Sequence, residues 1–296
     1  MYDIEALYEA SSTAEALELL AKYSDARIIA GGSDVLIEIR NGKLAGCKLV
    51  SIQKLDELRG VSMDSEKGLR IGAMTSMSSL SGDPLIQKHF RVLAEAAETI
   101  GGPQLRNIAT IGGNVCNGVT SADTASTLMA YDAVMEYLGP KGKRLVPIKE
   151  HYVAAGKTAM EHCEILAAII IPLDSYENCF GHYIKYAMRE ALDIATLGCS
   201  ANVRLSNDKK TIQRLRLAYG VAGPVPMRSP SAEELAGRPA SEDTIEDTIN
   251  AAAKAALADI KPRTSWRASA EFRLHLAEEL ARRALRESVI QAGGVL

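Results

Sequence analysis

Hydrophobic and polar positions alternate in short blocks along the first half of the chain, and the period of the pattern changes from block to block. After Ser12, apolar residues recur at helical spacing for about ten residues, and the Glu15 side chain can reach back to the Ser12 amide in a capping box. Helices are also expected from residue 75 and over 92–100. Short alternations typical of strands cover 26–30, 48–52 and 68–73. Because strands and helices alternate, this half predicts an α/β fold.

The second half of the chain changes from strands to helices. Residues 163–172 form an apolar run typical of a buried strand, and the polar stretch 174–178 after it is a candidate domain boundary. Strands are then expected at 182–187, 199–205 and 214–222, with a hairpin turn at 206–210 and helices from about residue 231. A length of 296 residues suggests about two domains. We therefore predict a first domain over 1–175 and a second, α+β domain over 176–296.

Composition and charge narrow the classes of function. Apolar residues make up 47% of the chain, and 34 basic against 37 acidic residues give a net charge of −3. Nucleic-acid binding normally shows a basic stripe, so no nucleic-acid partner is expected. The longest apolar run, 165–171, is far shorter than the ~20 residues of a membrane helix. The N-terminus lacks the basic and apolar regions of a signal peptide. We expect a cytoplasmic protein with no membrane partner.

The cysteines and histidines do not suggest a metal site. The cysteines are far apart in the sequence and include no CxxC pair; they are Cys47, Cys116, Cys163, Cys179 and Cys199. Zinc ribbons and iron–sulfur clusters need closely spaced thiolates. The five histidines are scattered as well. We expect structural thiols in a reducing compartment and no metal held by this chain.

A glycine pair follows the strand expected at 26–30. The segment AGGSD, residues 30–34, can approach a ligand closely because glycine has no side chain and tolerates positive φ. Successive free amides in such a turn form a concave anion site, for which a pyrophosphate is a natural ligand. A plain turn is the alternative interpretation. The chain contains neither the P-loop pattern nor the GxGxxG dinucleotide fingerprint, so a nucleotide here would be bound in another way.

A second glycine pair lies about 80 residues later, in TIGGN at 110–114. It belongs to RNIATIGGNVCNGVTSADTA, 106–125, which carries many short hydrogen-bonding side chains and almost no charge. A loop of this length that is ordered is usually packed or functional. Two glycine-rich turns and a polar loop suit a long ligand with a diphosphate in the middle and hydroxyls on either side.

Five segments, spread over nearly the whole chain, carry a resemblance to a known family. They are AGGSDVL (30–36), RNIATIGGNVCN (106–117) with SAD (121–123), EIL (164–166) with IIP (170–172), KYAMREALDIA (185–195) and SWRASAEFR (265–273). In this order and spacing they resemble the FAD-binding medium subunit of molybdenum hydroxylases, the xanthine dehydrogenase family. The resemblance implies the two-lobed FAD-binding domain of the CO dehydrogenase flavoprotein (PCMH) type over 1–175. It also implies a C-terminal antiparallel sheet with helices over 176–296.

The resemblance also implies which residues contact FAD. They are Ile29, Ala30, Gly31, Gly32, Ser33, Asp34, Val35, Leu36, Ile100, Gly101, Thr110, Ile111, Gly112, Gly113, Asn114, Asp123, Leu166 and Lys185.

The roles implied for these residues differ along the cofactor. The stretches 29–36 and 110–114 would form the two halves of a cradle for the diphosphate and ribityl region. Asp123 would bond cofactor hydroxyls, Leu166 would pack on the adenine or flavin side, and Lys185 would supply a cation. The family's stacking aromatic is replaced here by Ile100 followed by Gly101, which suggests an aliphatic flavin contact.

Two alternatives stay open on the late motif. Lys185 could be a solvated strand residue. Arg189 and Asp193, four positions apart, could pair with each other as structure rather than serve the cofactor.

The function implied is that of an electron-transfer subunit. Molybdopterin and [2Fe–2S] clusters would sit on partner subunits, with a dimer of heteromers as the implied assembly. Electrons would pass through FAD to NAD(P)+. The complex would hydroxylate an N-heterocycle such as a purine or nicotinate. Hydride transfer from flavin needs no side-chain base, so no catalytic residue is named in this chain. The alternatives are the same role in an aldehyde or CO dehydrogenase, or a nucleotide-binding regulatory or assembly factor without redox function.

Overall fold

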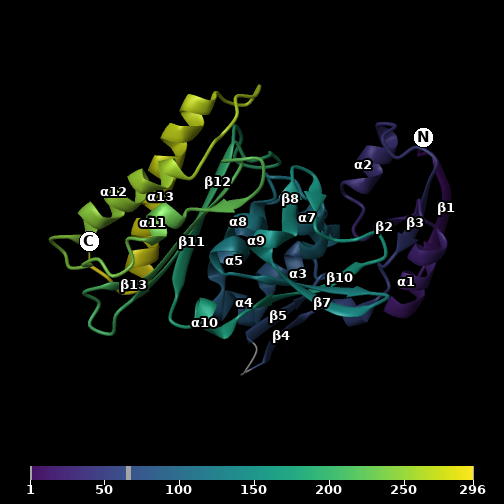
Figure 1. The fold of residues 1–296 in the computed structure, drawn as a ribbon, viewed down its shortest axis with the longest axis horizontal. Coiled ribbons are helices and arrows are strands. Elements are labelled where there is room, and N and C mark those ends of the chain that lie inside the picture. The colour runs from purple at the N-terminus through teal and green to yellow at the C-terminus, as the bar shows by residue number, and fades with distance from the viewer. Residues whose placement is uncertain (1, 65–67, 296) are drawn as a thin grey trace.

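The computed structural model describes residues 2–64 and 68–295. Figure 1 shows an elongated molecule with the N-terminus at one end and the C-terminal sheet and helices at the other. A small parallel sheet, a larger antiparallel sheet and a third, antiparallel sheet follow one another along its length. Among the residues described, no helix is long and apolar enough to span a membrane.

The N-terminal lobe is a three-stranded parallel sheet in the order β1-β3-β2. Its elements are β1 (Ile4–Glu9), α1 (Thr13–Lys22), β2 (Arg27–Ile29), α2 (Val35–Arg40) and β3 (Cys47–Ser51). Ser12 caps α1 as predicted, since its Oγ accepts from the Glu15 amide at 3.1 Å. The rest of the capping-box prediction is wrong. The Glu15 carboxylate accepts from the Ser11 amide at 2.8 Å, because Ser11 offers it both an amide and a hydroxyl.

The second lobe contains a five-stranded sheet in which all neighbouring strands are antiparallel. In sheet order the strands are β4 (Val61–Asp64), β5 (Gly68–Gly72), β10 (Ile165–Ile171), β6 (Val134–Gly139) and β7 (Gly142–Pro147). The helical elements are η1 (Asp56–Leu58), α3 (Met77–Gly82), α4 (Pro84–His89), α5 (Arg91–Glu98), α6 (Pro103–Ile108), α7 (Ile111–Cys116), α8 (Asp123–Ala130) and α9 (Ile148–His151). A short hairpin adds β8 (Tyr152–Ala154) and β9 (Lys157–Thr158).

The C-terminal part follows the short helix α10 (Leu173–Tyr176), which lies where a polar boundary was expected. Its antiparallel sheet contains β11 (Phe180–Tyr186), β12 (Leu197–Leu205), β13 (Ile212–Gly220) and β14 (Met227–Arg228). The helices are α11 (Pro230–Glu233), α12 (Ile245–Ala255), η2 (Ala256–Ala258) and α13 (Ala270–Gln291). The predicted hairpin at 206–210 is confirmed, since the Ser206 amide donates to the Thr211 carbonyl at 2.9 Å.

The third sheet is covered on both faces. Helix α13 packs on β11 and β12 from one side, while α5 and α8 of the second lobe pack from the other (Figure 1). Alternation along β12 explains this arrangement, because its odd-numbered residues such as Leu197 and Cys199 join the apolar core under α12 and α13. Its even-numbered residues Ser200 and Asn202 lie on the opposite face, toward α8. The two apolar cores thus have a polar layer between them.

Candidate cofactor site

The first glycine motif leaves β2 and turns into α2. Gly32 has φ +77°, a conformation that favours glycine. A side chain at Gly31 could not be accommodated, since a Cβ atom there would lie 1.9 Å from the Ile108 carbonyl oxygen. Gly31 therefore lets the loop touch the segment just before the second motif. The fold brings the two glycine motifs together, as the prediction of a shared cradle requires.

The amides of this first loop are available to a ligand. No described residue accepts a hydrogen bond from the backbone N–H of Gly31, Gly32, Ser33 or Asp34. The loop itself is held from behind, because the Gln53 side-chain amide donates to the Ala30 carbonyl at 2.8 Å. Adjacent free amides on a fixed, glycine-containing turn form an anion-binding concavity. This geometry is compatible with the predicted anion site, and the ligand at this motif stays a prediction.

The second motif differs from its prediction. It is the start of helix α7, with Thr110 as the N-cap and its Oγ1 accepting from the Gly113 amide at 3.0 Å. The amides of Ile111 and Gly112 donate to the carbonyls of Thr75 and Ala73 at 3.0 and 2.8 Å, and the Asn114 amide donates to the Thr110 carbonyl. The expected turn with free amides is wrong here, because these donors are used by the helix and by the strand-end segment 73–75. What remains for a ligand is the exposed, side-chain-free surface of Gly113.

The loop at Ile100 and Gly101 lies at the C-terminal end of α5. Ile100 is buried, and Gly101 has φ +51°. Arg106 fixes this loop by donating from Nη1 to the carbonyls of Glu98 and Ile100 at 3.0 and 3.1 Å. The Leu192 side chain comes within 3.2 Å of where a Gly102 Cβ would be. The loop therefore meets the segment after β11, which carries the late motif.

Asp123 and Lys185 form a buried ion pair with Nζ and Oδ2 2.9 Å apart, and their side chains are 9% and 8% exposed. Tyr183 donates its hydroxyl to the other Asp123 oxygen at 2.9 Å, and Lys185 also donates to the Thr99 carbonyl at 3.0 Å. Burial raises the pKa of Asp123, and the nearby ammonium opposes that rise. The alternative of a solvated Lys185 is wrong.

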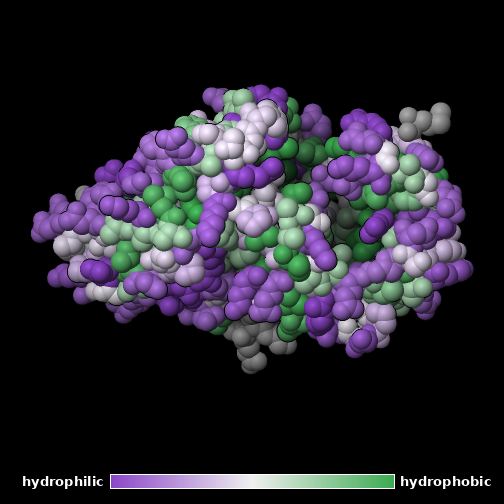
Figure 2. All heavy atoms as spheres, turned by 45° about the horizontal axis from the view of Figure 1, so that its top comes forward, coloured by the Kyte–Doolittle hydropathy of each residue, from purple (hydrophilic) through white to green (hydrophobic). Residues whose placement is uncertain are grey.

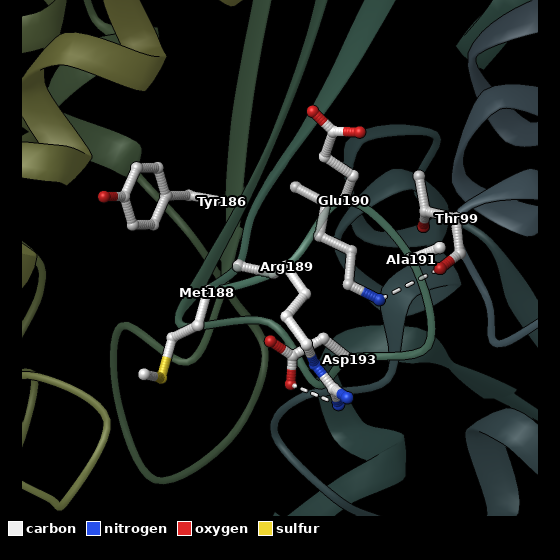
Figure 3. Close-up of a pocket in the computed structure, with 9 residues that line it drawn as sticks. Thr99, Tyr186, Met188, Arg189, Glu190, Ala191 and Asp193 are labelled. Carbon is white, nitrogen blue, oxygen red and sulfur yellow. Dashed lines mark hydrogen bonds and ion pairs between the residues drawn. The ribbon is translucent and has the colours of Figure 1, made fainter.

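A pocket of about 340 Å³ opens beside this ion pair. Its lining is formed by Thr99, Lys185 and the segment after β11. Figure 3 shows Thr99 across from the segment that carries Arg189 and Asp193. Arg189 Nη2 lies 3.6 Å from Asp193 Oδ1 and donates to the Leu192 carbonyl at 2.6 Å. The alternative that Arg189 and Asp193 pair with each other is confirmed, and this pairing shapes the pocket's outer wall.

One expected contact lies apart from this arrangement. Leu166 is buried in β10, opposite Tyr137 of β6 and within the apolar core of the second lobe. It does not line the pocket beside Lys185. Its contact with a cofactor stays a prediction.

Two residues of the site were not anticipated from the sequence. Tyr183 precedes Lys185 by two positions on a strand, so the period of two places both on one face and could have indicated it. Thr99 contributes a backbone carbonyl, and no sequence signal identifies such a contact. No group of histidine, cysteine or acidic residues suited to a metal occurs in the described part of the chain.

The surface is hollowed between the N-terminal lobe and the middle of the molecule, with hydrophobic residues inside the hollow (Figure 2). The open amides of 31–34 lie in the loop that leads into α2, and the exposed Gly113 lies on α7. An anion-binding loop, a side-chain-free helix start and a pocket with one lysine are features suited to an elongated nucleotide cofactor.

Comparison with known families agrees with this geometry. Residues 2–174 match the FAD binding domain in molybdopterin dehydrogenase, and residues 182–288 match the CO dehydrogenase flavoprotein C-terminal domain. The chain belongs to the FAD-binding medium subunits of the molybdenum hydroxylases, the xanthine dehydrogenase family. It is thus a subunit of an oxidoreductase, and its fold is that of the CO dehydrogenase flavoprotein.

Individual relatives resemble the chain over most of its length. The xanthine dehydrogenase FAD-binding subunit of Escherichia coli O157:H7 is 43% identical over 297 residues, covering 100% of both chains. The nicotinate dehydrogenase FAD-subunit of Eubacterium barkeri is 31% identical over 79% of this chain and 80% of its own length. A solved carbon monoxide dehydrogenase structure from Hydrogenophaga pseudoflava matches 97% of this chain and 98% of its own, with TM-score 0.90 and 29% identity.

Proposed function

We propose that FAD lies along the hollow between α2 and α7, with its diphosphate on the amides of residues 31–34. The observation that supports this best is the set of four consecutive backbone donors without a protein acceptor among the described residues. Gly31 lets this loop pack against Ile108, and the exposed Gly113 would let the cofactor approach α7 closely. The residues 29–36, 100–101 and 110–114 would form the walls of the site.

The flavin end of the cofactor would enter the pocket beside Lys185. That pocket contains a buried cation whose charge is balanced by Asp123. When bound, FAD supplies the chemistry of taking electrons singly and releasing them as a hydride. The protein's own residues would position the ring and exclude water from it. In this proposal the FAD-binding domain is 1–175 and the C-terminal domain 176–296.

The redox partners are proposed from the family to which the chain belongs. We infer that electrons arrive from a [2Fe–2S] subunit, that molybdopterin sits on a further subunit, and that NAD(P)+ is the acceptor. An N-heterocycle such as a purine is the favoured substrate of the whole complex, because the relative named as a xanthine dehydrogenase subunit is 43% identical over the full chain. A dimer of such heteromers is the proposed assembly.

The test uses the complex purified from its native host under anaerobic conditions. Xanthine, nicotinate and an aldehyde are added in turn, and the visible absorbance of the flavin is followed together with NADH and NADPH formation. The proposal predicts flavin bleaching with a heterocycle and then formation of a reduced pyridine nucleotide. Loss of flavin absorbance without formation of NADH or NADPH would refute NAD(P)+ as the electron acceptor. A flavin that no substrate bleaches would refute the electron-transfer role and favour a non-redox factor.

A further inference from the structure

The layer between α8 and the C-terminal sheet contains buried polar atoms without protein partners. Thr127 Oγ1, Ser200 Oγ and both amide atoms of Asn202 are inaccessible and find no hydrogen bond among the described residues. All three residues are at most 1% exposed. An unpaired buried hydroxyl or amide is costly, so such groups are normally satisfied, often by ordered water.

These residues lie on two surfaces that face each other. Helix α8 packs on β12 and β13. Asp123 and Thr127 are four positions apart on one face of α8. Ser200 and Asn202 lie on the face of β12 turned away from the apolar core under α13. In the register of the sheet, Ser200 is opposite Tyr183.

Hydrogen bonds and ion pairs define both ends of this layer. At one end Tyr183 bonds Asp123, which pairs with Lys185 beside the pocket. At the other end Asn202 is opposite Arg216 of β13, whose Nε lies 3.5 Å from Asp132 Oδ2. The Asp132 side chain is 35% exposed and so reaches solvent. We call the row Asp123, Tyr183, Thr127, Ser200, Asn202 and Arg216 the polar seam.

We propose that the polar seam binds a file of ordered water molecules that carries protons between the solvent at Asp132 and the Lys185–Asp123 pair. Each unpaired atom of the seam supplies a partner for such waters, which typically make about three hydrogen bonds. Hydroxyls of Thr127, Ser200 and Tyr183 can both donate and accept, as proton relay requires. The proton-carrying role rests on the proposed function of the chain. The binding of water in the polar seam does not depend on that function.

The chemistry at the pocket consumes and releases protons, which such a path would carry. Two-electron reduction of an oxidised flavin consumes two protons, and returning a hydride to an acceptor leaves one proton to be released. One-electron carriers deliver no protons, so the protons come from solvent. The polar seam is the buried polar connection that the described residues provide between the lysine and the opposite surface.

The first readout is structural. A crystal structure of the chain at about 1.5 Å resolution should show ordered waters bonded to Ser200 Oγ, Asn202 and Thr127 Oγ1. Direct pairing of these atoms with one another, leaving no water between α8 and β12, would overturn the proposal. The waters can be observed whether or not the chain holds FAD. A negative result for the water site can therefore be distinguished from failure of the proposed function.

The second readout is kinetic and uses the purified complex. Dithionite serves as a one-electron donor that brings no protons, and flavin reduction is followed by stopped flow in H₂O and D₂O. Thr127→Val and Asn202→Leu should slow reduction about tenfold and change its solvent isotope effect, while FAD content and visible spectrum stay unchanged. Thr248→Val, which alters a buried threonine on α12, is the control and should leave the rate unchanged. Unchanged rates in both seam variants would overturn the proton-carrying role.

Discussion

At the scale of single residues, the Lys185–Asp123 pair shows how the site handles buried charge. Each side chain is almost fully enclosed, and each has a second partner, the Thr99 carbonyl for the lysine and the Tyr183 hydroxyl for the aspartate. Burial raises the pKa of Tyr183 well above its usual value, so that hydroxyl remains a donor. Removing only one partner of such a buried ion pair is costly, because the other charge stays buried without a partner.

We predict that Asp123→Ala or Lys185→Ala alone lowers the free energy of unfolding by about 3–5 kcal/mol, because each leaves one buried charge without its partner. The double variant should lose less than the sum of the two single losses. Urea unfolding followed by circular dichroism measures all three. Losses that simply add would show that the two charges do not depend on each other.

His151 is a second residue whose environment fixes its charge. It is fully buried, its Nε2 lies 3.1 Å from the Val115 carbonyl oxygen, and its Nδ1 contacts the Tyr137 hydroxyl. A carbonyl only accepts, so Nε2 bears the hydrogen and Nδ1 accepts from Tyr137. Burial lowers the pKa of His151, and the bond to Val115 opposes that effect. The neutral ring is the form that fits.

This depressed pKa predicts acid sensitivity. Above pH ~6.5 the ring is neutral in both folded and unfolded chains. Below that pH the unfolded chain takes up a proton that the folded chain refuses, so stability falls by up to about 1.4 kcal/mol per pH unit until the folded pKa is reached. His151→Gln should therefore lose less unfolding free energy between pH 7 and 5 than the parent chain does. Urea unfolding at a series of pH values across this range measures the difference.

His182 provides a control of opposite sign. Its hydrogen bond to Glu95, at 3.0 Å, raises the pKa of this histidine despite partial burial. Its stabilisation is complete below the unfolded pKa and is lost as pH rises through the folded value. His182→Gln should therefore steepen the loss in acid. Identical slopes in the parent and both variants would contradict these assignments.

At the scale of elements, helix α7 is the part of the site that carries the second glycine motif. It is held by Thr110 at its start, by His151 through Val115, and by Thr124, whose hydroxyl donates to the Asn114 side chain at 2.6 Å. Gly113 is exposed on this helix, and an added Cβ would meet only the Thr110 hydroxyl at 3.0 Å. A side chain at Gly113 would therefore press only on the Thr110 cap, which would have to shift by a few tenths of an ångström.

We predict that Gly113→Val leaves the far-ultraviolet circular dichroism unchanged and weakens FAD binding at least about tenfold, because the added branches project where the cofactor should lie. Titration of the apoprotein with FAD, followed by quenching of flavin fluorescence, measures the affinity. Gly82→Val is the control, since Gly82 is also a helical glycine and no atom lies within 4 Å of its Cβ position. Equal affinities of the two variants would contradict the placement of the cofactor against α7.

The hydrophobic pattern of the sequence predicted strands and turns better than it predicted how the segments between them fold. The strands at 26–30 and 48–52 and the hairpin at 206–210 follow from apolar alternation and turn residues, and the structure contains them. Helix α7 was missed because two glycines in a row are poor helix formers and predict a turn. The cap from Thr110 and the amide contacts with 73–75 override that propensity, and those contacts are long-range.

At the scale of the whole molecule, the site exists because the fold joins segments far apart in sequence. Gly31 touches Ile108, Leu192 covers Gly102, and Lys185 crosses from the third sheet to Asp123. The motifs identified the participating segments, but no local pattern could show that Asp123 and Lys185 pair with each other. The polar seam was invisible for the same reason, since buried serine and asparagine on a strand resemble solvent-facing positions.

The central claim is that this chain binds FAD between its N-terminal lobe, α7 and the pocket beside Lys185. The most direct measurement is the visible absorption spectrum of the purified chain, followed by heat release and chromatographic identification of the cofactor. We predict a flavin spectrum and released FAD, near one per chain, in the parent and in Gly82→Val but not in Gly113→Val. A folded, colourless chain that also fails to take up added FAD would contradict the account.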